Sequence, residues 1–462
     1  MKMKLKHTLT SIFYITSFAL CAQSWQNVED FTTVGGNVLY DNYNSTADFT
    51  FNSNNQPIVA YSRASDKQLT VLEFNGTSWS SLGDLSFLTT EISQVKIEIV
   101  MDGTIFLAYT DDNYQQLSII KFDGTSWIYV AQNIAGNKAL GIDLAKDTFD
   151  NIYIAYKDDL NEDKATLKKY DFITGNIFTV GNEGFTPTTV EDLKLAINPV
   201  TSEPFVVYNF NGRAHVYKFN GSTWNQVGSD FFSTYFDSNT NVTYDKSVID
   251  TDIEFSSSGE LLSCTCESLF FEFDRSGSYC YTFENNNWAS TPIYGGNNYI
   301  NMKSDGEGNI YYTSSKFNTT LGEYYGLYFG KYNNGNYENL TSIETGSHGN
   351  SFLQINFDNQ NTPFVIYSRF LFASSHIRKF TSNLNINEFN QNNLSVFPNP
   401  TSSFLTIHNI NSPTNFSIYS ISGKLVSSGE VSNNEKINLT SLTKGIYFLK
   451  LKKRNSIKII KK

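Results

Sequence analysis

The feature that most constrains this chain is a short motif that recurs about every fifty residues. Residues 74–79 read Phe-Asn-Gly-Thr-Ser-Trp, residues 122–127 read Phe-Asp-Gly-Thr-Ser-Trp, and residues 219–224 read Phe-Asn-Gly-Ser-Thr-Trp. Looser copies place Ile177, Trp288 and Tyr337 in the tryptophan position, which therefore recurs after 48, 50, 47, 64 and 49 residues. A repeat of this length cannot bury its apolar side alone, and it is typical of the blades of a β-propeller.

The same order of strands and turns recurs upstream of each copy. An alternating segment is followed by a strand that ends in Ala-Tyr, as in residues 57–61, 105–109 and 152–156, and then by a polar loop and a third strand. The Asn-Gly or Asp-Gly pair then closes a tight hairpin, because both central residues of that turn need positive φ. We therefore expect four antiparallel strands in each repeat, with the aromatic position on the outermost strand.

The repeats can be counted. Units begin near residues 46, 94, 141, 191, 250, 299 and 350, which predicts seven blades; six or eight stay open because the fifth unit is long and irregular. The last unit lacks an outermost strand, and the segment 24–28 has the sequence of one without a blade of its own. Donation of that segment to the last blade would close the ring and remove exposed sheet edges. The whole pattern resembles the propeller-like repeats of secreted bacterial proteins, which implies a fold and no activity.

The two ends of the chain carry signals of a different kind. Residues 1–22 combine a basic start, an apolar stretch and small residues before Gln23, which predicts a cleaved signal peptide. Cys21 leaves a lipoprotein anchor open, although Leu20 is bulky for that motif. No later segment holds eighteen uninterrupted apolar residues, so we expect no membrane span.

After an Asn-rich linker at 386–393, residues 394–462 predict about seven short strands and an Ig-like β-sandwich. Its Phe-Pro-Asn-Pro opening, Gly-Lys-Leu-Val centre, Gly-Ile-Tyr-Phe-Leu-Lys-Leu segment and basic end resemble the C-terminal sorting domain of type IX secretion substrates. The resemblance implies transport through the periplasm to the outer surface, and removal of the domain by a sortase-like peptidase. The residues that carry the motif are Pro398, Asn399, Pro400, Gly423, Lys424, Gly445 and Tyr447. The predicted organisation is then leader 1–22, propeller 23–385, linker and sorting domain.

Three cysteines follow the leader: Cys264, Cys266 and Cys280. Cys264 and Cys266 share one strand face, and Cys280 lies one hairpin later, so one cross-strand disulfide with one remaining thiol is expected in an oxidising compartment. A metal site is disfavoured because no fourth ligand lies nearby in sequence.

Ligand-binding candidates gather in loops that share one face of a propeller of this strand order. They are Arg63, Asp66, Asp111, Asp112, Asp158, Asp159 and Arg369, together with Phe231, Phe232, Tyr235 and Phe236 in the insertion 229–250. Carboxylates and aromatic planes of this kind bind glycans or anchor protein interfaces. The alternative is that the acidic residues only stabilise turns. Clustered oxygen ligands in 111–113 and 158–163 suggest calcium weakly, because their spacing differs from that of known calcium loops.

The net charge of −11 disfavours nucleic acid as the main partner, and motifs for zinc proteases, serine hydrolases and phosphate binding are missing. The leading hypothesis is therefore a noncatalytic secreted or surface protein whose propeller binds carbohydrate or protein. The alternatives are a glycoside hydrolase with a carboxylate pair at the channel mouth and a structural surface-layer component. Buried carboxylates in the channel would favour the hydrolase, and an aromatic rim would favour binding.

Overall fold

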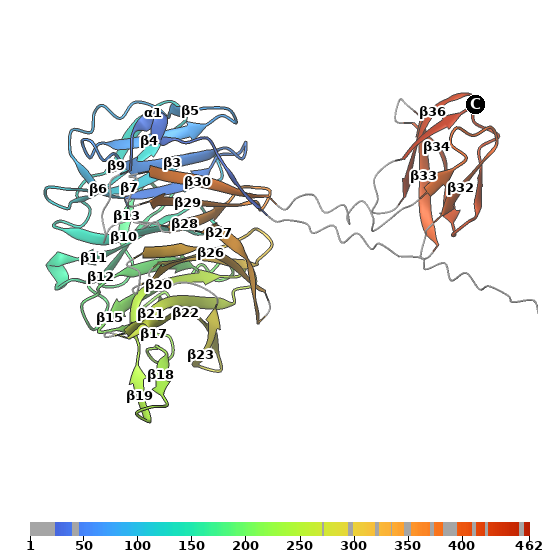
Figure 1. Cartoon of the computed structure of the whole chain (residues 1–462). Helices are drawn as coiled ribbons and strands as arrows, with labels where there is room; N and C mark the ends of the chain where they lie inside the picture. The colour runs from blue at the N-terminus through green and yellow to red at the C-terminus, as the bar shows by residue number, and fades with distance from the viewer. Residues whose placement is uncertain are drawn as a thin grey trace, which may run out of the picture. The chain divides into compact units, whose positions relative to one another are not determined.

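The computed structural model describes residues 24–38, 46–269, 272–293, 299–318, 323–333, 335–345, 353–369, 374–381, 395–408, 413–420, 424–451 and 457–462. The predicted leader with Cys21, the linker and Gly423 lie outside these residues. The chain divides into two compact units, one spanning Gln23–Thr381 and the other formed by the C-terminal part that follows. Each unit is all-β apart from a short helix α1 (Thr32–Gly35) and a 3-10 turn η1 (Asp159–Asn161) in the first (Figure 1).

The first unit contains seven four-stranded antiparallel sheets, as the repeat predicts. Blade 1 is β2 (Ala47–Phe51), β3 (Pro57–Ser62), β4 (Leu69–Phe74) and β5 (Trp79–Ser81). Blade 2 is β6 (Ile92–Ile99), β7 (Ile105–Asp111), β8 (Leu117–Phe122) and β9 (Trp127–Ala131). Blade 3 is β10 (Ala139–Lys146), β11 (Ile152–Asp158), β12 (Lys164–Tyr170) and β13 (Ile177–Thr179).

The remaining blades follow the same order, from the innermost to the outermost strand. Blade 4 is β14 (Leu193–Ile197), β15 (Pro204–Phe210), β16 (Arg213–Phe219) and β17 (Trp224–Gln226), and blade 5 is β20 (Ser247–Phe255), β21 (Leu261–Leu269), β22 (Glu272–Glu284) and β23 (Asn287–Ile293). Blade 6 is β24 (Ile300–Ser304), β25 (Ile310–Asn318), β26 (Glu323–Asn333) and β27 (Asn336–Thr345). Blade 7 is β28 (Leu353–Phe357), β29 (Pro363–Arg369), β30 (Ser374–Thr381) and β1 (Ser24–Asn27).

Two observations show that the ring of blades is closed. Strand β1 pairs antiparallel with β30, so the N-terminal segment supplies the outermost strand of the last blade, as predicted. The innermost strands contact one another in the cyclic order β2, β6, β10, β14, β20, β24, β28 and back to β2. In Figure 1 the brown strands of blade 7 lie beside the blue strands of blade 1. The fold is a seven-bladed β-propeller.

Hydrophobic clusters lie between neighbouring blades. One of them joins Ile58 and Val71 of blade 1 to Val95, Leu107 and Trp127 of blade 2. Each strand face buries its apolar side chains against the next blade, which explains why a single repeat cannot stand alone. The aromatic position of the motif therefore serves packing between blades.

In blades 2, 4 and 5 the tryptophan of the motif donates a hydrogen bond to the backbone of the preceding blade. Trp127 Nε1 donates to the carbonyl of Leu82 at 2.7 Å, Trp224 Nε1 to Val180 at 2.9 Å and Trp288 Nε1 to Val227 at 2.9 Å. Each accepting residue precedes a glycine of positive φ (Gly83, Gly181 and Gly228), and a Cβ on these glycines would meet the indole at 2.8 to 2.9 Å. Only glycine fits there, because backbone and indole approach so closely.

Blade 5 contains a disulfide. Cys264 on β21 lies directly opposite Cys280 on β22, and their sulfur atoms form a disulfide bond. Cys266 remains outside the disulfide and is buried, with its sulfur 3.5 Å from the Ser278 hydroxyl oxygen.

The C-terminal unit has two sheets that share one core. Strands β31 (Ser395–Phe397), β32 (Phe404–His408) and β35 (Lys436–Asn438) form one sheet, and β34 (Leu425–Val431), β33 (Thr414–Ser420), β36 (Gly445–Leu451) and β37 (Ile457–Lys461) form the other. Leu405 and Ile437 of the first sheet pack with Ile418, Leu449 and Ile459 of the second. This is the small seven-stranded sandwich that the sequence predicts.

Candidate functional site

The acidic loop residues predicted as ligands are engaged within the loops themselves. The Asp111 carboxylate accepts from the N–H of Tyr114 at 2.6 Å, and Asp158 accepts from the N–H of Leu160 and from the Thr166 hydroxyl. Asp111 and Asp158 are buried, so these carboxylates cap turns. Among the described residues, no group of three or more acidic, His or Cys side chains is arranged to hold a metal ion.

The remaining charged loop candidates form ion pairs or hydrogen bonds. Arg63 and Asp66 form an ion pair at 2.6 Å, Asp112 pairs with Lys67 of the neighbouring blade, and Asp159 accepts from Asn137 Nδ2 at 2.6 Å. The side chain of Arg369 lies outside the described residues. Arg63, Asp66, Asp112 and Asp159 are therefore each paired with another side chain of the loops.

The aromatic insertion separates into a buried base and an exposed tip. Phe231 is 4% exposed and packs against Tyr281 and Trp288, and the Arg213 guanidinium lies 3.7 Å from the Phe232 ring centroid. The base is fixed to blade 5, because the buried Glu267 accepts from the N–H of Ser233 at 2.7 Å.

The tip of the insertion is a two-stranded hairpin, β18 (Thr234–Asp237) and β19 (Val242–Asp245), which projects from the propeller in Figure 1. Tyr235 is half-buried, whereas Phe236, Val242 and Tyr244 are exposed. Of the predicted aromatic residues, Phe236 is therefore the one presented to solvent.

The sequence analysis placed a carboxylate pair at the channel mouth in its hydrolase alternative, but it named none of the residues that line the central channel. The innermost strands line a cavity of about 390 Å³. One residue from each successive blade contributes to a polar ring around it: Asp48, Lys96, Asp143, Lys194, Asp252, Asn301 and Gln354. Charges alternate over the first five positions, so each lysine has an aspartate in the blade on either side. Below we call these seven residues the channel ring.

Carboxylates and amides of the innermost strands join adjacent blades. The innermost strand is an edge of its own sheet. The N–H groups that point away from the second strand therefore need hydrogen-bond acceptors outside the sheet. These contacts are Ile97 N–H to Asp48 (3.0 Å), Ile142 N–H to Gln94 (3.2 Å), Leu195 N–H to Asp143 (2.8 Å), Ile300 N–H to Asp250 (2.8 Å), Met302 N–H to Asp252 (2.7 Å), Ile355 N–H to Asn301 (2.8 Å) and Asn356 Nδ2 to the Phe49 carbonyl (2.9 Å). The channel ring therefore has a structural role as well as a polar surface.

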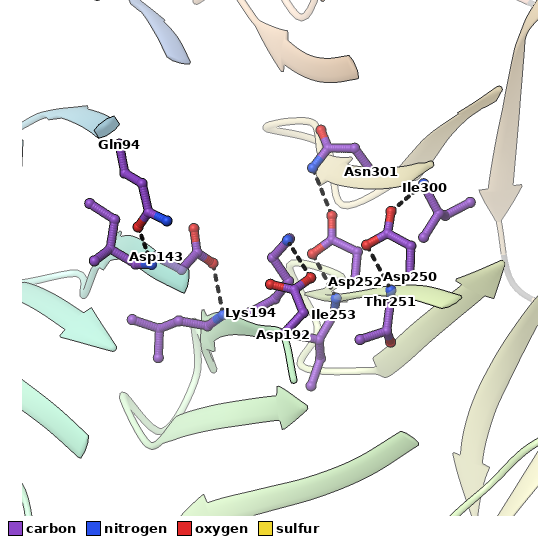
Figure 2. Close-up of polar contacts among 12 residues, drawn as sticks. Gln94, Asp143, Asp192, Lys194, Asp250, Thr251, Asp252, Ile253, Ile300 and Asn301 are labelled. Carbon is purple, nitrogen blue, oxygen red and sulfur yellow. Dashed lines mark hydrogen bonds and ion pairs between the residues drawn. The ribbon is translucent and has the colours of Figure 1, made fainter. Parts of the chain in front are cut away.

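The lysines of the channel ring remain charged. Lys96 lies 3.0 Å from Asp143, and Lys194 lies 3.3 Å from Asp192. Burial alone would lower the pKa of Lys194, but Asp192 and the carboxylates of the adjacent blades raise it. Figure 2 shows this arrangement, with Asp192 beside the Lys194 ammonium, Asp250 and Asp252 on one side and Asp143 on the other.

Burial has the opposite effect on the carboxylates. It raises the pKa of Asp48 to about 6, although Lys96 partly offsets this. In the same way it raises the pKa of Asp250 to about 6 and that of Asp252 to about 7, against the opposing effect of Lys194. Carboxylates with such pKa values can exchange protons near neutral pH, which is the property of a general acid or base.

Lys303 differs from the other channel lysines. It lies two residues beyond Asn301 on β24, and no described residue forms an ion pair or hydrogen bond with its ammonium. Burial disfavours its charge, but Glu254 and Glu98 outweigh that effect and raise its pKa. Among the described residues, the Lys303 ammonium is therefore stabilised by nearby carboxylates without a direct hydrogen bond or ion pair, and it lines a polar cavity.

A signal for the channel was present in the sequence. The first strands carry charges at alternate positions, as in Lys96-Ile97-Glu98 and Asp252-Ile253-Glu254. A strand that is innermost in a closed ring has no solvent-exposed outer face, so charges at every second position imply a shared polar space. Attention to the loops alone misses this pattern.

The comparisons with known proteins bear on the two units differently. Residues 395–462 match the family model described as the secretion system C-terminal sorting domain. The C-terminal unit is a type IX sorting domain. It directs the chain out of the cell or onto its outer surface. In the part of the chain that the structure describes, no helix is long and apolar enough to span a bilayer.

The propeller resembles solved structures in fold only. They include a mutant of the Aleuria aurantia lectin in complex with a fucosylated GlcNAc (13% identity, TM-score 0.40, covering 67% of this chain and 98% of that one). Another is a polysaccharide lyase, an ulvan lyase (10% identity, TM-score 0.49, covering 77% and 95%). A third is AofleA from Arthrobotrys oligospora (10% identity, TM-score 0.41, covering 67% and 88%). At this level of likeness neither ligands nor reactions transfer. No curated protein matches the chain in sequence.

Proposed function

We propose that this exported propeller is a noncatalytic carbohydrate-binding protein, and that an uncharged sugar residue occupies the central channel. The observation that carries the proposal is the cavity of about 390 Å³, which is lined by the ammonium of Lys303, a group that no described residue contacts through a hydrogen bond or an ion pair. Cavities of roughly 300 to 1,000 Å³ are typical of small-molecule sites. The channel falls at the lower end of this range, which suits a mono- or disaccharide.

The charge of the lining favours a neutral ligand over an ionic one. Five carboxylates and four lysines line the cavity: Asp48, Glu98, Asp143, Asp252, Glu254, Lys96, Lys146, Lys194 and Lys303. The near balance of charge gives a multiply charged ligand little net attraction. Amides, ammonium groups and carboxylates offer hydrogen-bond donors and acceptors close together, which matches the hydroxyl groups of a sugar.

The contacts of the carboxylates favour binding over catalysis. The Asp252 carboxylate accepts from the N–H groups of Ile253 and Met302 and from Asn301 Nδ2. The Asp143 carboxylate is held by Lys96 and by the N–H of Leu195. A general acid or base needs an oxygen directed at the substrate, whereas these oxygens already bind fixed protein donors.

The proposal is tested on the mature chain, residues 23–462, with an array of neutral and acidic glycans followed by calorimetry on any hit. Lys303→Met removes the ammonium and keeps the length of the side chain, and it should weaken binding at least tenfold. Lys121→Met, on β8 and outside the cavity lining, is the matched control and should bind normally. If the wild type binds no glycan, or if Lys303→Met binds as tightly as the wild type, the proposal is wrong.

A hydrolase with its acid and base in the channel is the second candidate. Buried carboxylates line the channel, which the sequence analysis expects of a hydrolase, and burial raises the pKa of Asp48 and of Asp252. The array hits should be incubated with the protein and the products followed by chromatography. Hydrolysis that disappears in Asp252→Asn, while binding persists, would replace the binding proposal with this one.

We further propose that the sorting domain is removed after transport by the sortase-like peptidase of its secretion route. The protein recovered from the cell surface or the medium should then lack residues 395–462, as measured by mass spectrometry. Recovery of the full-length chain outside the cell would contradict this.

A further inference from the structure

Two motif residues of the sorting domain, Asn399 and Tyr447, hold its last strand and one of its turns. Asn399 Nδ2 donates to the carbonyl of Lys458 at 2.7 Å, and Asn399 Oδ1 accepts from the N–H of Ile460 at 2.9 Å. The Tyr447 hydroxyl donates to the carbonyl of Thr443 at 2.9 Å. Recognition by a partner therefore needs other side chains of the domain.

The outer face of the four-stranded sheet presents such side chains. Along β36, Tyr447, Leu449 and Leu451 point into the core, whereas Ile446 and Phe448 are 36% and 37% exposed. Ile460 on β37 is 38% exposed and lies directly opposite Ile446.

The strand register makes these side chains contiguous. Leu425 lies opposite Tyr419, Tyr419 opposite Phe448, and Phe448 opposite Lys458, so one row crosses all four strands. We call Leu425, Tyr419, Phe448, Ile446 and Ile460 the apolar row. Directly opposed side chains in antiparallel strands lie on the same face and in contact. Exposed apolar patches of this kind mark sites of interaction.

The charge around the apolar row indicates what covers it. Residues 395–462 contain ten Lys and Arg residues and two acidic ones, in a chain whose net charge is −11. Lys450 and Lys458 are exposed on the same face as the apolar row. A complementary surface is therefore apolar at its centre and carries carboxylates at its rim.

We propose that the apolar row is the docking surface of the sorting domain, and that its partner is a protein of the export machinery with an apolar, acid-rimmed contact surface. A protein fits better than a lipid surface, because the row lies on a β-sheet rather than along an amphipathic helix. This inference is independent of what the propeller binds.

The test uses the full chain, expressed in a cell that has the secretion route. Phe448→Ser combined with Ile460→Thr should reduce the amount outside the cell at least tenfold and leave the chain in the periplasm. Phe404→Ser is the matched control, because Phe404 is 43% exposed on the other sheet. Unfolding of each purified full chain, followed by circular dichroism, checks that the sandwich stays folded. Normal export of the folded double variant would overturn the proposal.

Photo-crosslinking identifies the partner. A photoreactive residue at position 448 should crosslink to a protein of the export machinery, and one at position 404 should not. Lys450→Glu with Lys458→Glu should weaken that crosslink, whereas Lys436→Glu, beside Phe404, should not. Crosslinks from position 448 only to the chain's own propeller, to a second copy or to lipid would overturn the proposal.

Discussion

The outer rim and the central channel of the propeller use their polar groups in opposite ways. At the rim, the same pair of a tryptophan and a glycine joins blade 2 to blade 1, blade 4 to blade 3 and blade 5 to blade 4, and each of these three indole N–H groups donates to a backbone carbonyl. In the channel the side chain differs from blade to blade, from Asp48 and Lys96 to Asn301 and Gln354. The repeated positions stabilise the ring, and the varied positions give the channel its particular surface.

Removal of a rim tryptophan should have the largest effect on stability. Trp127 is 4% exposed, packs on Gly83 and donates to Leu82, so Trp127→Ala should lower the free energy of unfolding by about 3–5 kcal/mol. Ile128→Ala, the exposed neighbour on the same strand, should change it by less than about 0.5 kcal/mol. Urea unfolding compares the two. Equal effects would mean that the motif does not hold the blades together.

A substitution that breaks the channel ring should lower the free energy of unfolding somewhat less than removal of a rim tryptophan. Lys96→Met leaves Asp143 buried without its cation, and loss of one partner from a buried pair costs about 3 kcal/mol. Lys96→Met with Asp143→Asn should recover much of this, because the amide oxygen still accepts from Leu195. A double variant no more stable than the single one in urea would show that charge balance does not govern the ring.

The pH dependence of stability should distinguish the channel from the rim. Asp252 has a pKa of about 7 in the folded chain and an ordinary value near 3.8 when unfolded, so the folded state binds the extra proton between those values. Raising the pH from 5 to 8 should therefore lower the free energy of unfolding, and Asp48 and Asp250 act in the same direction. Asp252→Asn should flatten this decline in urea titrations at several pH values. An unchanged slope would contradict the assigned shift.

A substitution in the exposed hairpin should have the smallest effect on stability. Phe236 is 56% exposed, so Phe236→Ser should alter stability by less than about 0.5 kcal/mol. We also expect the variant to retain glycan binding as measured by calorimetry. Loss of binding in Phe236→Ser, together with normal binding in Lys303→Met, would move the site from the channel to the hairpin.

The fold could be predicted from sequence to a large extent, because turns and packing positions recur. The tryptophan spacing and the leftover strand at Ser24–Asn27 predicted seven blades and their closure, and both predictions are confirmed. The predicted geometry of the Asn-Gly and Asp-Gly turns was wrong. In these turns only Gly76, Gly124 and Gly221 have positive φ, whereas the Asn or Asp before each glycine accepts from a backbone N–H three residues on. The sorting domain was predictable for a different reason, since its motif residues hold turns that the fold requires.

The channel was harder to predict. An aspartate in a turn and an aspartate in a channel look the same in a sequence, and Asp111 and Asp158 proved to be turn residues. The channel residues come from seven strands between about 40 and 60 residues apart, and only ring closure brings them together. Lys303 in particular has no local motif. Its position becomes meaningful only once the neighbouring blades are in place.

The channel site can be tested most directly with the two methionines that follow the predicted leader. Met302 is buried beside the channel, and its N–H binds Asp252, whereas Met101 is 82% exposed on a turn of blade 2. With ¹³C-methyl methionine in the mature chain, a saturating glycan hit should shift the Met302 methyl resonance and leave that of Met101 in place. Saturation that leaves the Met302 resonance unmoved would contradict a sugar site in the channel.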